Sequence, residues 1–545
     1  MKINLVLSLL LLIWISCVLA HKGNTEKKLK IYFDDIKGPT QEQLDNIAIK
    51  AFKDRRVKKY LKNNRYRLLS VEIVNEENEE KGEEYIPSEY LATVYDYTNN
   101  RAILIRGSIR NGKVNLVEES GLQPHPNNEE FEEAVEILRE NGNFSYPLQH
   151  NLTNVFLDIV PTIIGEFPDG RTERILAMHL HSENPEYPNE TVGVNMSRRT
   201  VVRYGLDHPH GSCGIAPGMD RGSKEGLIGS KRIRVVRGNT KLWEFEVIRP
   251  SSSSGTKTKR SGVELRGVRY KGKKVLYRAH VPILNVKYEN TSICGPYRDW
   301  QWEESTFEAY GVDIGRGIRF CSQPPRTILE SKSDTGNFRG VAIYVVGQQI
   351  VLVSQLKAGW YRYISEWRLH ANGTIQPRFG FTAINNHCVC NKHTHHVYWR
   401  LDFDIRTAGN NIVREYNDPP IFSSKYHTKS YEINRLKSVS HRRHWEIRNA
   451  AGGDSYALIP GSQDGMADNE FGYGDLWVLK YHKNELDDGR TLIQGEDAKA
   501  DLKRFVNGES VYKKDVVLWY AAHFSHVIHH ELGRVVGPDL TPIKW

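Results

Sequence analysis

The second half of the chain is built almost entirely from short strand-like runs. From about residue 226 onward, Gly, Asn and Asp separate these runs, and few stretches have helical periodicity. Such a pattern is typical of a large antiparallel β-sandwich. At 545 residues the chain is too long for one ordinary domain, so we expect about two to four domains.

The first half has a different periodicity. Two segments, 28–118 and 128–205, each begin with a helical pattern and continue with strand-like runs. The predicted helices span 41–61 and 128–140, and the predicted strands span 67–74, 91–97, 101–109, 113–118, 155–166, 173–180 and 200–204. The predicted fold class is therefore two small α+β N-terminal units, a Gly/His/Pro-rich linker over 206–224, and a large mainly-β domain over 226–545.

Residues 1–20 have the pattern of a secretory signal peptide, with Lys2 before an apolar run and Val18-Leu19-Ala20 at the cleavage position. No later segment has the roughly 18 consecutive apolar residues that a membrane span needs. We therefore expect a secreted, extracellular protein without a membrane span. In a eukaryotic host, its Asn-X-Ser/Thr sequons would be candidate glycosylation sites: Asn143, Asn151, Asn189, Asn195, Asn290 and Asn372.

The charge of the chain disfavours one class of partner, and its cysteine content predicts at least one unpaired thiol. The net charge of +9 and pI of about 9.0 are mild for this length, and no Lys/Arg stripe with interleaved aromatics occurs, so a nucleic-acid partner is disfavoured. Without Cys17 of the signal peptide, an odd number of cysteines remains, and at least one lacks an intrachain partner. We predict a disulfide between Cys294 and Cys321, with two buried free thiols as the alternative. Cys388-Val-Cys390 is too tight for a standard metal finger and has no partner pair.

Two histidines, His393 and His395, begin a strand-like run and lie at positions i and i+2. Their side chains therefore point to the same face of the strand and can reach one metal ion. His526, in a later strand-like run, is a third candidate. Three neutral imidazoles suit copper or zinc, although a lone His-X-His in a chain with 21 histidines is a weak signal.

The residues around these histidines carry a family resemblance. The run from His393 to Asp404, and the C-terminal run from Trp477 to His526, resemble the copper-ligand strands of copper-containing amine oxidases. The resemblance is clear over 226–542 and weak before that. It implies an amine-oxidase supersandwich as the catalytic domain, preceded by paired small domains of which the first is cystatin-like. It also implies a homodimer and copper bound by His393, His395 and His526.

By the same resemblance, Tyr361 is the precursor of topaquinone, a cofactor that these enzymes make from one of their own tyrosines. Its offsets to Trp367 and to Gly373-Thr374-Ile375 fit the family's precursor tyrosine. In the family that tyrosine lies in an Asn-Tyr-Asp/Glu motif, but here Trp360 stands in place of the Asn and Arg362 in place of the acid. These departures matter because the Asn is thought to restrain the quinone and because the acid's charge is reversed. The alternative is that Tyr361 is an ordinary buried strand tyrosine.

The resemblance also implies a base and a hydrogen-bonding tyrosine. Asp313, in Asp313-Ile-Gly, is the best match for the carboxylate that removes the α-proton of the amine, and Glu308 is its rival. Such a carboxylate needs a pKa raised by burial, whereas a solvated turn aspartate would not have one. Tyr288 takes the position of the tyrosine that contacts the quinone oxygen; otherwise it is a surface strand tyrosine.

A second metal is expected near the end of the copper strand. By resemblance, side chains and carbonyls in two short runs form a structural calcium site, whose hard oxygen ligands suit Ca²⁺: Asp402, Phe403, Asp404, Asp515 and Val516. The alternative is strand aspartates in salt bridges. His529 and His530 stand where the family has Pro-Arg, and could form a local metal site, but they do not fit the His-Glu-X-X-His pattern of zinc proteases.

We therefore predict a secreted copper- and topaquinone-dependent primary-amine oxidase, which converts a primary amine and O₂ into an aldehyde, ammonia and hydrogen peroxide. Two alternatives stay open. One is a catalytically inactive copper-binding relative on the same fold, which Trp360 and Arg362 favour. The other is a metal-dependent hydrolase that uses zinc and a bound water at the same three histidines.

Overall fold

The computed structural model describes most of the chain after residue 27. The described residues are 28–35, 39–74, 81, 88–120, 124, 126–158, 165–166, 172–182, 184, 186–187, 190–203, 213–216, 218, 229–255, 261–289, 294–299, 301, 303–315, 317–468, 470–489, 498–526 and 534–545. The signal peptide, most of the predicted linker, two sequons (Asn189 and Asn290) and the pair His529 and His530 lie outside them.

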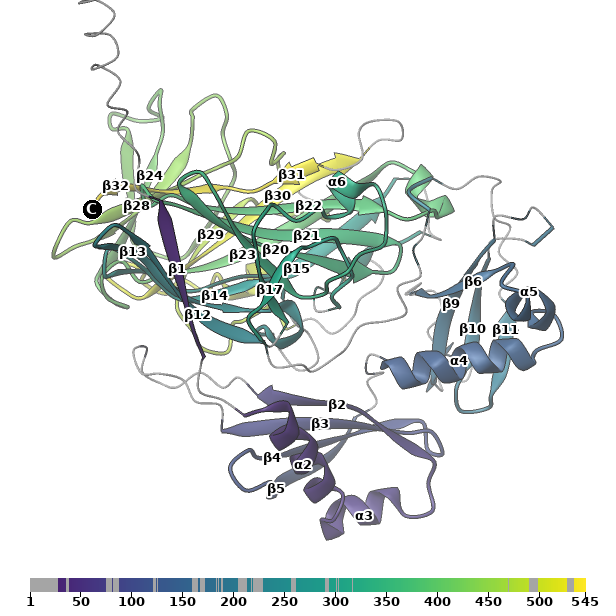
Figure 1. The fold of residues 1–545 in the computed structure, drawn as a ribbon. Helices are drawn as coiled ribbons and strands as arrows, with labels where there is room; N and C mark the ends of the chain where they lie inside the picture. Colours follow the sequence, from purple (N-terminus) through teal and green to yellow (C-terminus); the bar gives the residue numbers. More distant parts are fainter. Residues whose placement is uncertain are drawn as a thin grey trace, which may run out of the picture.

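Two large β-sheets form the predicted sandwich (Figure 1). The ten-stranded sheet has the order β1 (Leu29–Asp35), β12 (Ser230–Arg237), β13 (Thr240–Ile248), β14 (Glu264–Tyr270), β15 (Lys273–Tyr288), β23 (His393–Phe403), β30 (Val516–His526), β29 (Leu476–Lys480) and β26 (Ile433–Arg435), with β16 (Tyr297–Asp299) paired to β15. Every pairing in this sheet is antiparallel.

The twelve-stranded sheet lies against the first one. Its order is β17 (Gly311–Asp313), β18 (Ile318–Cys321), β19 (Val341–Val346), β20 (Gln349–Ala358), β21 (Tyr361–His370), β22 (Ile375–Ala383), β32 (Asp539–Lys544), β28 (Ser455–Ile459), β27 (His444–Asn449), β24 (Asn411–Tyr416) and β25 (Tyr426–Lys429), with β31 (Arg534–Val536) paired to β22. The largest buried apolar cluster draws from both sheets, including Trp243, Trp367 and Trp399. Burial of such large aromatic side chains is the main term that holds the two sheets together.

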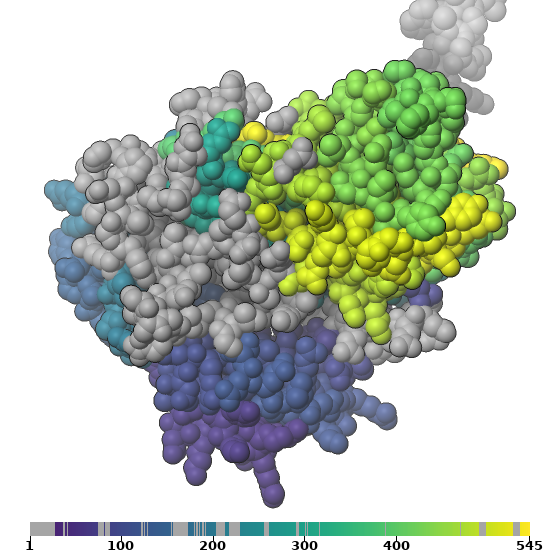
Figure 2. Space-filling model, turned by 180° about the vertical axis from the view of Figure 1, so that it is seen from behind, coloured from purple at the N-terminus to yellow at the C-terminus, as the bar shows by residue number. Residues whose placement is uncertain are grey.

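Two smaller α+β units precede the sandwich, as predicted. The first packs α2 (Gln41–Ala51) and α3 (Arg55–Leu61) on the sheet β2 (Tyr66–Val74), β3 (Glu89–Asp96), β4 (Arg101–Ser108) and β5 (Val114–Ser120). The second contains α4 (Asn128–Glu140), α5 (Ser145–Gln149), the sheet β11 (Thr200–Arg203), β10 (Glu190–Asn195), β9 (Ile175–His181) and β6 (Asn154–Asp158), and the pair β7 (Gly165–Glu166) and β8 (Thr172–Glu173). Seen from behind, the first unit, in purple and blue, lies below the sandwich (Figure 2).

The structure corrects three details of these units. β1 is not part of the first unit, because it pairs with β12 along its whole length, from Leu29 to Asp35, and forms an edge of the sandwich. The single predicted helix over 41–61 is two helices. Asp54 is the N-cap of α3, because its side chain accepts a hydrogen bond from the Arg56 amide. The strand β10 was not predicted. The alternation of apolar and polar residues along a strand is the same whichever sheet the strand joins. It therefore does not predict a distant partner strand such as β12.

The described sequons differ in accessibility. Asn143, Asn151 and Asn372 are exposed. Asn195 is buried on β10 and its amide donates to Glu173, so the prediction of a glycosylation site there is wrong for the folded chain. Of the helices that the structure describes, none is both long and apolar enough to cross a membrane.

Candidate functional site

The three candidate copper ligands meet at one end of the ten-stranded sheet. β15, β23 and β30 are neighbours there, and their register places Tyr288 opposite His393 and His393 opposite His526. Directly opposed residues of an antiparallel pair point to the same face, and His395 follows on that face two residues later. The ring centroids of His393 lie 5.1 Å from those of His395 and 4.9 Å from those of His526.

Each of the three imidazoles has one buried nitrogen that no described residue hydrogen-bonds: Nε2 of His393, Nε2 of His395 and Nδ1 of His526. The other nitrogen of His393 donates to the carbonyl of Asn391 at 2.7 Å, which fixes the tautomer and leaves Nε2 with its lone pair. Burial lowers the pKa of all three rings, for His393 to about 4. Neutral imidazoles with free lone pairs are the form that binds copper or zinc, so these residues fit a copper ion.

Tyr361 faces this group from the opposite sheet, at the start of β21. Its side chain is 1% exposed, and its ring centroid lies 4.7 Å from that of His395 and 5.6 Å from that of His393. The Tyr361 and Tyr288 hydroxyls hydrogen-bond to each other. The structure thus brings together the predicted cofactor precursor, the predicted tyrosine contact and the three candidate ligands. Phe381 completes the wall, with its ring 3.8 Å from that of His395.

A carboxylate that was not predicted, Asp299, reaches this group through Tyr363. The Tyr363 hydroxyl donates to Asp299 Oδ2, and it lies 3.2 Å from His395 Nδ1. Because the hydroxyl proton goes to Asp299, His395 Nδ1 is the donor to Tyr363, which leaves His395 Nε2 free for a metal. Burial raises the pKa of Asp299 to about 7. The one sequence signal for Asp299 is the presence of aromatic residues on both sides of it, from Tyr297 to Trp302, since such residues are mostly buried.

The residues predicted as base lie elsewhere. Asp313 is on β17, an edge strand; its side chain is 64% exposed and bonded to Arg319 at 2.5 Å, and that guanidinium lowers the pKa of Asp313. Glu308 pairs with Arg326. None of the contacts between described residues joins Asp313 or Glu308 to Tyr361. The Asp-X-Gly match selected Asp313 by sequence alone, and the fold turns it toward solvent.

The two residues beside Tyr361 that differ from the family motif, Trp360 and Arg362, each have a defined hydrogen-bond partner. The Trp360 indole donates to the Tyr288 hydroxyl at 2.9 Å and is buried. Arg362 points to the other side of β21, where it forms two hydrogen bonds with Asp334, at 2.6 and 2.8 Å, and both side chains are fully buried. The reversed charge at Arg362 is therefore balanced by an acid from another segment.

Residues 333–532 match the family model of the copper amine oxidase enzyme domain. This segment is therefore similar to the enzyme domain of the copper amine oxidases. Human copper-containing diamine oxidase is 23% identical over 351 residues, which are 50% of this chain and 46% of that protein. The chain thus spans about half the length of this relative.

Three solved structures share the fold of the whole chain. They are a copper-containing benzylamine oxidase from Hansenula polymorpha (TM-score 0.56, 12% identity, 96% of this chain and 94% of the other), a lysyl oxidase from Pichia pastoris (0.53, 11%, 95% and 92%) and an amine oxidase from Aspergillus nidulans (0.52, 14%, 96% and 89%). At these identities the likeness shows the fold alone.

Two disulfides brace the segment that leads into β23, the strand of two candidate copper ligands. Cys213–Cys390 and Cys294–Cys388 both end in the 3₁₀ helix η3 (His387–Cys390), just before His393. The prediction of a Cys294–Cys321 disulfide is therefore wrong, and Cys388 and Cys390 do have partners. Cys321 is a buried free thiol whose pKa burial raises to about 11.

The predicted calcium ligands lie at the other end of β23 and β30. Carboxylate oxygens of Asp402, Asp404 and Asp515 converge within 4.8 Å of one another, and Phe403 and Val516 face each other in the ladder. The Nζ atom of Lys81 lies among the carboxylates. Burial alone lowers the pKa of Lys81, but the three carboxylates outweigh it and raise that pKa. Burial raises the pKa of Asp404 and of Asp515.

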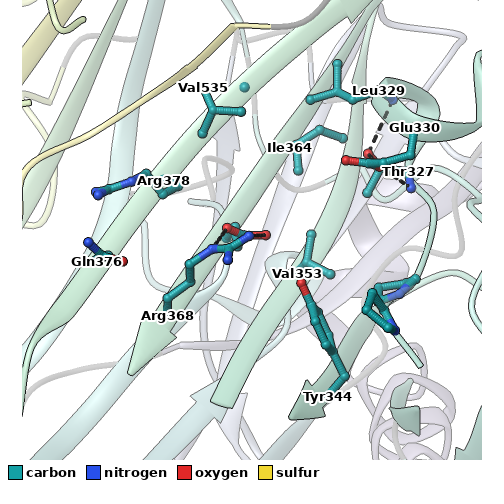
Figure 3. A pocket seen from close by; sticks show the side chains of 14 residues that line it. Thr327, Leu329, Glu330, Tyr344, Val353, Ile364, Arg368, Gln376, Arg378 and Val535 are labelled. Carbon is teal, nitrogen blue, oxygen red and sulfur yellow. Dashed lines mark hydrogen bonds and ion pairs between the residues drawn. The ribbon is translucent and has the colours of Figure 1, made fainter. Parts of the chain in front are cut away.

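A pocket of about 440 Å³ opens on the far side of the twelve-stranded sheet (Figure 3). Ile364 and Arg368 of β21 line it together with Arg378 of β22. Successive strand residues point to opposite faces, so Ile364 points away from the side that Tyr363 occupies. The sheet therefore separates this pocket from the histidines, and none of the predicted site residues lines it.

Proposed function

We propose that this protein is a copper- and topaquinone-dependent primary-amine oxidase. The reaction is RCH₂NH₂ + O₂ + H₂O → RCHO + NH₃ + H₂O₂. The observation that carries the proposal is the juxtaposition of Tyr361 with three buried imidazole nitrogens that have no hydrogen-bond partner. Copper held by His393, His395 and His526 would supply the O₂-dependent oxidation of the Tyr361 ring to the quinone that accepts the amine.

In this proposal Asp299 replaces Asp313 as the base that takes the α-proton of the amine. Its Oδ2 atom is held by the Tyr363 hydroxyl, and within the described part of the chain Oδ1 has no hydrogen bond and can accept a proton. A carboxylate with a pKa of about 7 is balanced between holding and releasing a proton near neutral pH. Its hydrogen bond through Tyr363 also ties its position to that of His395.

Tyr288 is a positioning residue in this proposal. Its hydroxyl bonds to that of Tyr361 and accepts from the Trp360 indole, so the three side chains form one hydrogen-bonded row. Trp360 would then restrain the Tyr361 ring through Tyr288, a task that the resemblance assigns to an Asn. The buried pair between Arg362 and Asp334 keeps β21 free of an unbalanced charge beside the site.

The substrate class we propose is small primary amines, with O₂ as the second substrate. The relatives act on diamines, benzylamine and lysyl groups according to their names, which share a primary amine and little else. We also propose secretion, which suits two disulfides near the site, and a homodimer, as the family resemblance implies.

The decisive test is phenylhydrazine titration of the full-length protein after loading with Cu²⁺ in air. We expect a coloured adduct that peptide mass spectrometry maps to Tyr361, together with O₂ uptake and H₂O₂ release on addition of benzylamine, a diamine or a lysine peptide. Tyr361→Phe should retain copper and lose the adduct. Tyr456→Phe is the matched control, because Tyr456 is a buried tyrosine whose hydroxyl bonds to the Gly373 carbonyl, remote from the ligands.

Two results would replace this proposal. Bound copper without any adduct at Tyr361 would indicate the inactive copper-binding relative. Bound zinc with hydrolytic activity and no O₂ uptake would indicate the hydrolase.

A further inference from the structure

The cage of acidic side chains at the far end of β23 and β30 already contains a cation of the protein's own. Lys81 Nζ lies 2.6 Å from Asp402 Oδ1, 2.7 Å from Asp515 Oδ1 and 3.3 Å from Asp404 Oδ1. These are the three side chains that sequence resemblance assigns to calcium. The ammonium group therefore occupies the point on which the predicted ligands converge.

Lys81 comes from a distant part of the chain. It lies between β2 and β3 of the first small unit, 321 residues before Asp402. Its side chain is only 4% exposed, and Nζ sits 3.7 Å from the ring centroid of Tyr481 and 5.0 Å from that of Tyr277. An ammonium that is enclosed by carboxylates on one side and aromatic faces on the other is held as a specific partner rather than as a surface charge.

The charges of the cage balance without a metal. Besides Lys81, Lys274 Nζ lies 3.6 Å from Asp404 Oδ2, and the Arg400 guanidinium lies 3.6 Å from Asp402 Oδ2. Three cationic side chains thus face three carboxylates. A divalent ion at the same point would add two positive charges within about 3 Å of Lys81, where unit charges repel strongly even at a high effective dielectric constant, so it would have to displace the ammonium.

We propose that Lys81 is a built-in cation that takes the place of a divalent metal in this cage, and that the native protein neither binds nor needs Ca²⁺ there. The same ion pairs join the first small unit to the sandwich. The inference does not depend on the proposed amine oxidation, because the cage lies about 30 Å from the candidate copper end by the rise of nine strand residues.

The experiment compares the native full-length protein with Lys81→Met, which keeps the length of the side chain and removes its charge. Bound calcium is measured by equilibrium dialysis and mass spectrometry, and thermal melting is followed in EDTA and in CaCl₂. We expect no bound calcium and unchanged melting for the native protein. Lys81→Met should melt several degrees lower in EDTA, bind one Ca²⁺ with a Kd below about 1 mM, and recover melting temperature with CaCl₂.

Lys480→Met is the matched control, because Lys480 pairs with Glu509 in an ion pair that is 37% and 29% exposed. It should melt like the native protein in both buffers. One equivalent of calcium bound to the native protein, with a higher melting temperature, would overturn the proposal, and so would a Lys81→Met protein that melts normally in EDTA and binds no calcium.

If Lys81→Met does not fold, the native measurement still decides, and Lys81→Gln supplies a second uncharged variant. The phenylhydrazine adduct of the folded variant should equal that of the native protein, so failure of this proposal and failure of the proposed amine oxidation give different results.

Discussion

Two metal sites are predicted, one at each end of the strands β23 and β30. The two ends differ in whether the predicted ligand atoms already have a partner within the protein. At one end His393 lies opposite His526, and the ligand nitrogens are buried without partners. At the other end Asp402 lies opposite Val517, and Lys81 lies between the carboxylates. At the first end the described nitrogens have no partner. At the other end the carboxylates have Lys81 as a charge partner, while Oδ2 of Asp402 and Oδ2 of Asp404 have cations at 3.6 Å but no hydrogen bond from a described residue.

The difference follows from charge. A neutral imidazole nitrogen can be buried unpaired at a desolvation cost of about 1–3 kcal/mol. Three converging carboxylates cannot, because burying like charges together costs far more unless a cation compensates them. Buried carboxylates of this kind therefore take up protons or pair with a cation. The ligand residues alone do not specify whether that cation is a metal ion or a side chain.

The largest expected effect is loss of the copper end. His395→Ala removes a ligand, and we expect the bound copper, the phenylhydrazine adduct and at least about 10³-fold of the activity to disappear, as measured by metal analysis and O₂ uptake. The neighbouring His396→Ala is the control, because His396 points to the other face and bonds to His523 at 2.8 Å. Full copper content in His395→Ala would contradict the ligand assignment.

The next effect tests the base. We expect Asp299→Asn to lower kcat by about 10²–10⁴-fold while copper is retained. The native kcat/KM should rise with pH through about 7, because the carboxylate must lose its proton to act as a base, and the variant should lack this rise. Asp313→Asn should leave the rates and the pH profile unchanged, and a loss in Asp313→Asn alone would return the role to the residue predicted from sequence.

A third test concerns the charge of Arg362 beside Tyr361. It asks whether Asp334 balances that charge as the three carboxylates balance Lys81. Arg362→Leu leaves Asp334 buried without its partner, and we expect the free energy of unfolding to fall by about 3–5 kcal/mol. Denaturant titration measures this fall. Arg234→Leu breaks an exposed pair with Asp34 and should change stability by at most about 1 kcal/mol. Equal losses of unfolding free energy in the two variants would mean that the buried pair stabilises the protein no more than the exposed pair.

The smallest expected effect concerns the two disulfides. Among the described residues they lie only near the candidate copper ligands. Replacing Cys294 and Cys388 together by Ser opens a loop of 94 residues, and we expect a loss of about 2–4 kcal/mol. Calorimetry measures the loss, and copper should dissociate faster from the variant. Cys321→Ala, at the buried free thiol, should retain the copper affinity; faster copper loss there would show that the disulfide is not the cause.

Much of the fold was predictable because it follows from local patterns. The strand alternation after residue 226 predicted the sandwich, and the helical periodicity over 128–140 predicted α4 with its bounds unchanged. The assignment of β1 failed because its partner, β12, lies about 200 residues away. Likewise, Cys294 pairs with Cys388 and not with the nearer Cys321. In both cases the pairing partner depends on tertiary contacts that periodicity does not encode.

The sequence by itself predicted the candidate copper ligands and the candidate cofactor tyrosine. His393 and His395 share a face through the strand repeat alone, and the family resemblance selected Tyr361 and His526. Only the tertiary structure brought Asp299 to Tyr363 and Lys81 to the three carboxylates, and both proposals rest on these contacts. Asp299 meets Tyr363 across 64 residues and Lys81 meets Asp402 across 321. Burial sets the pKa of a carboxylate and the need for its counter-charge, and burial is a property of the folded chain.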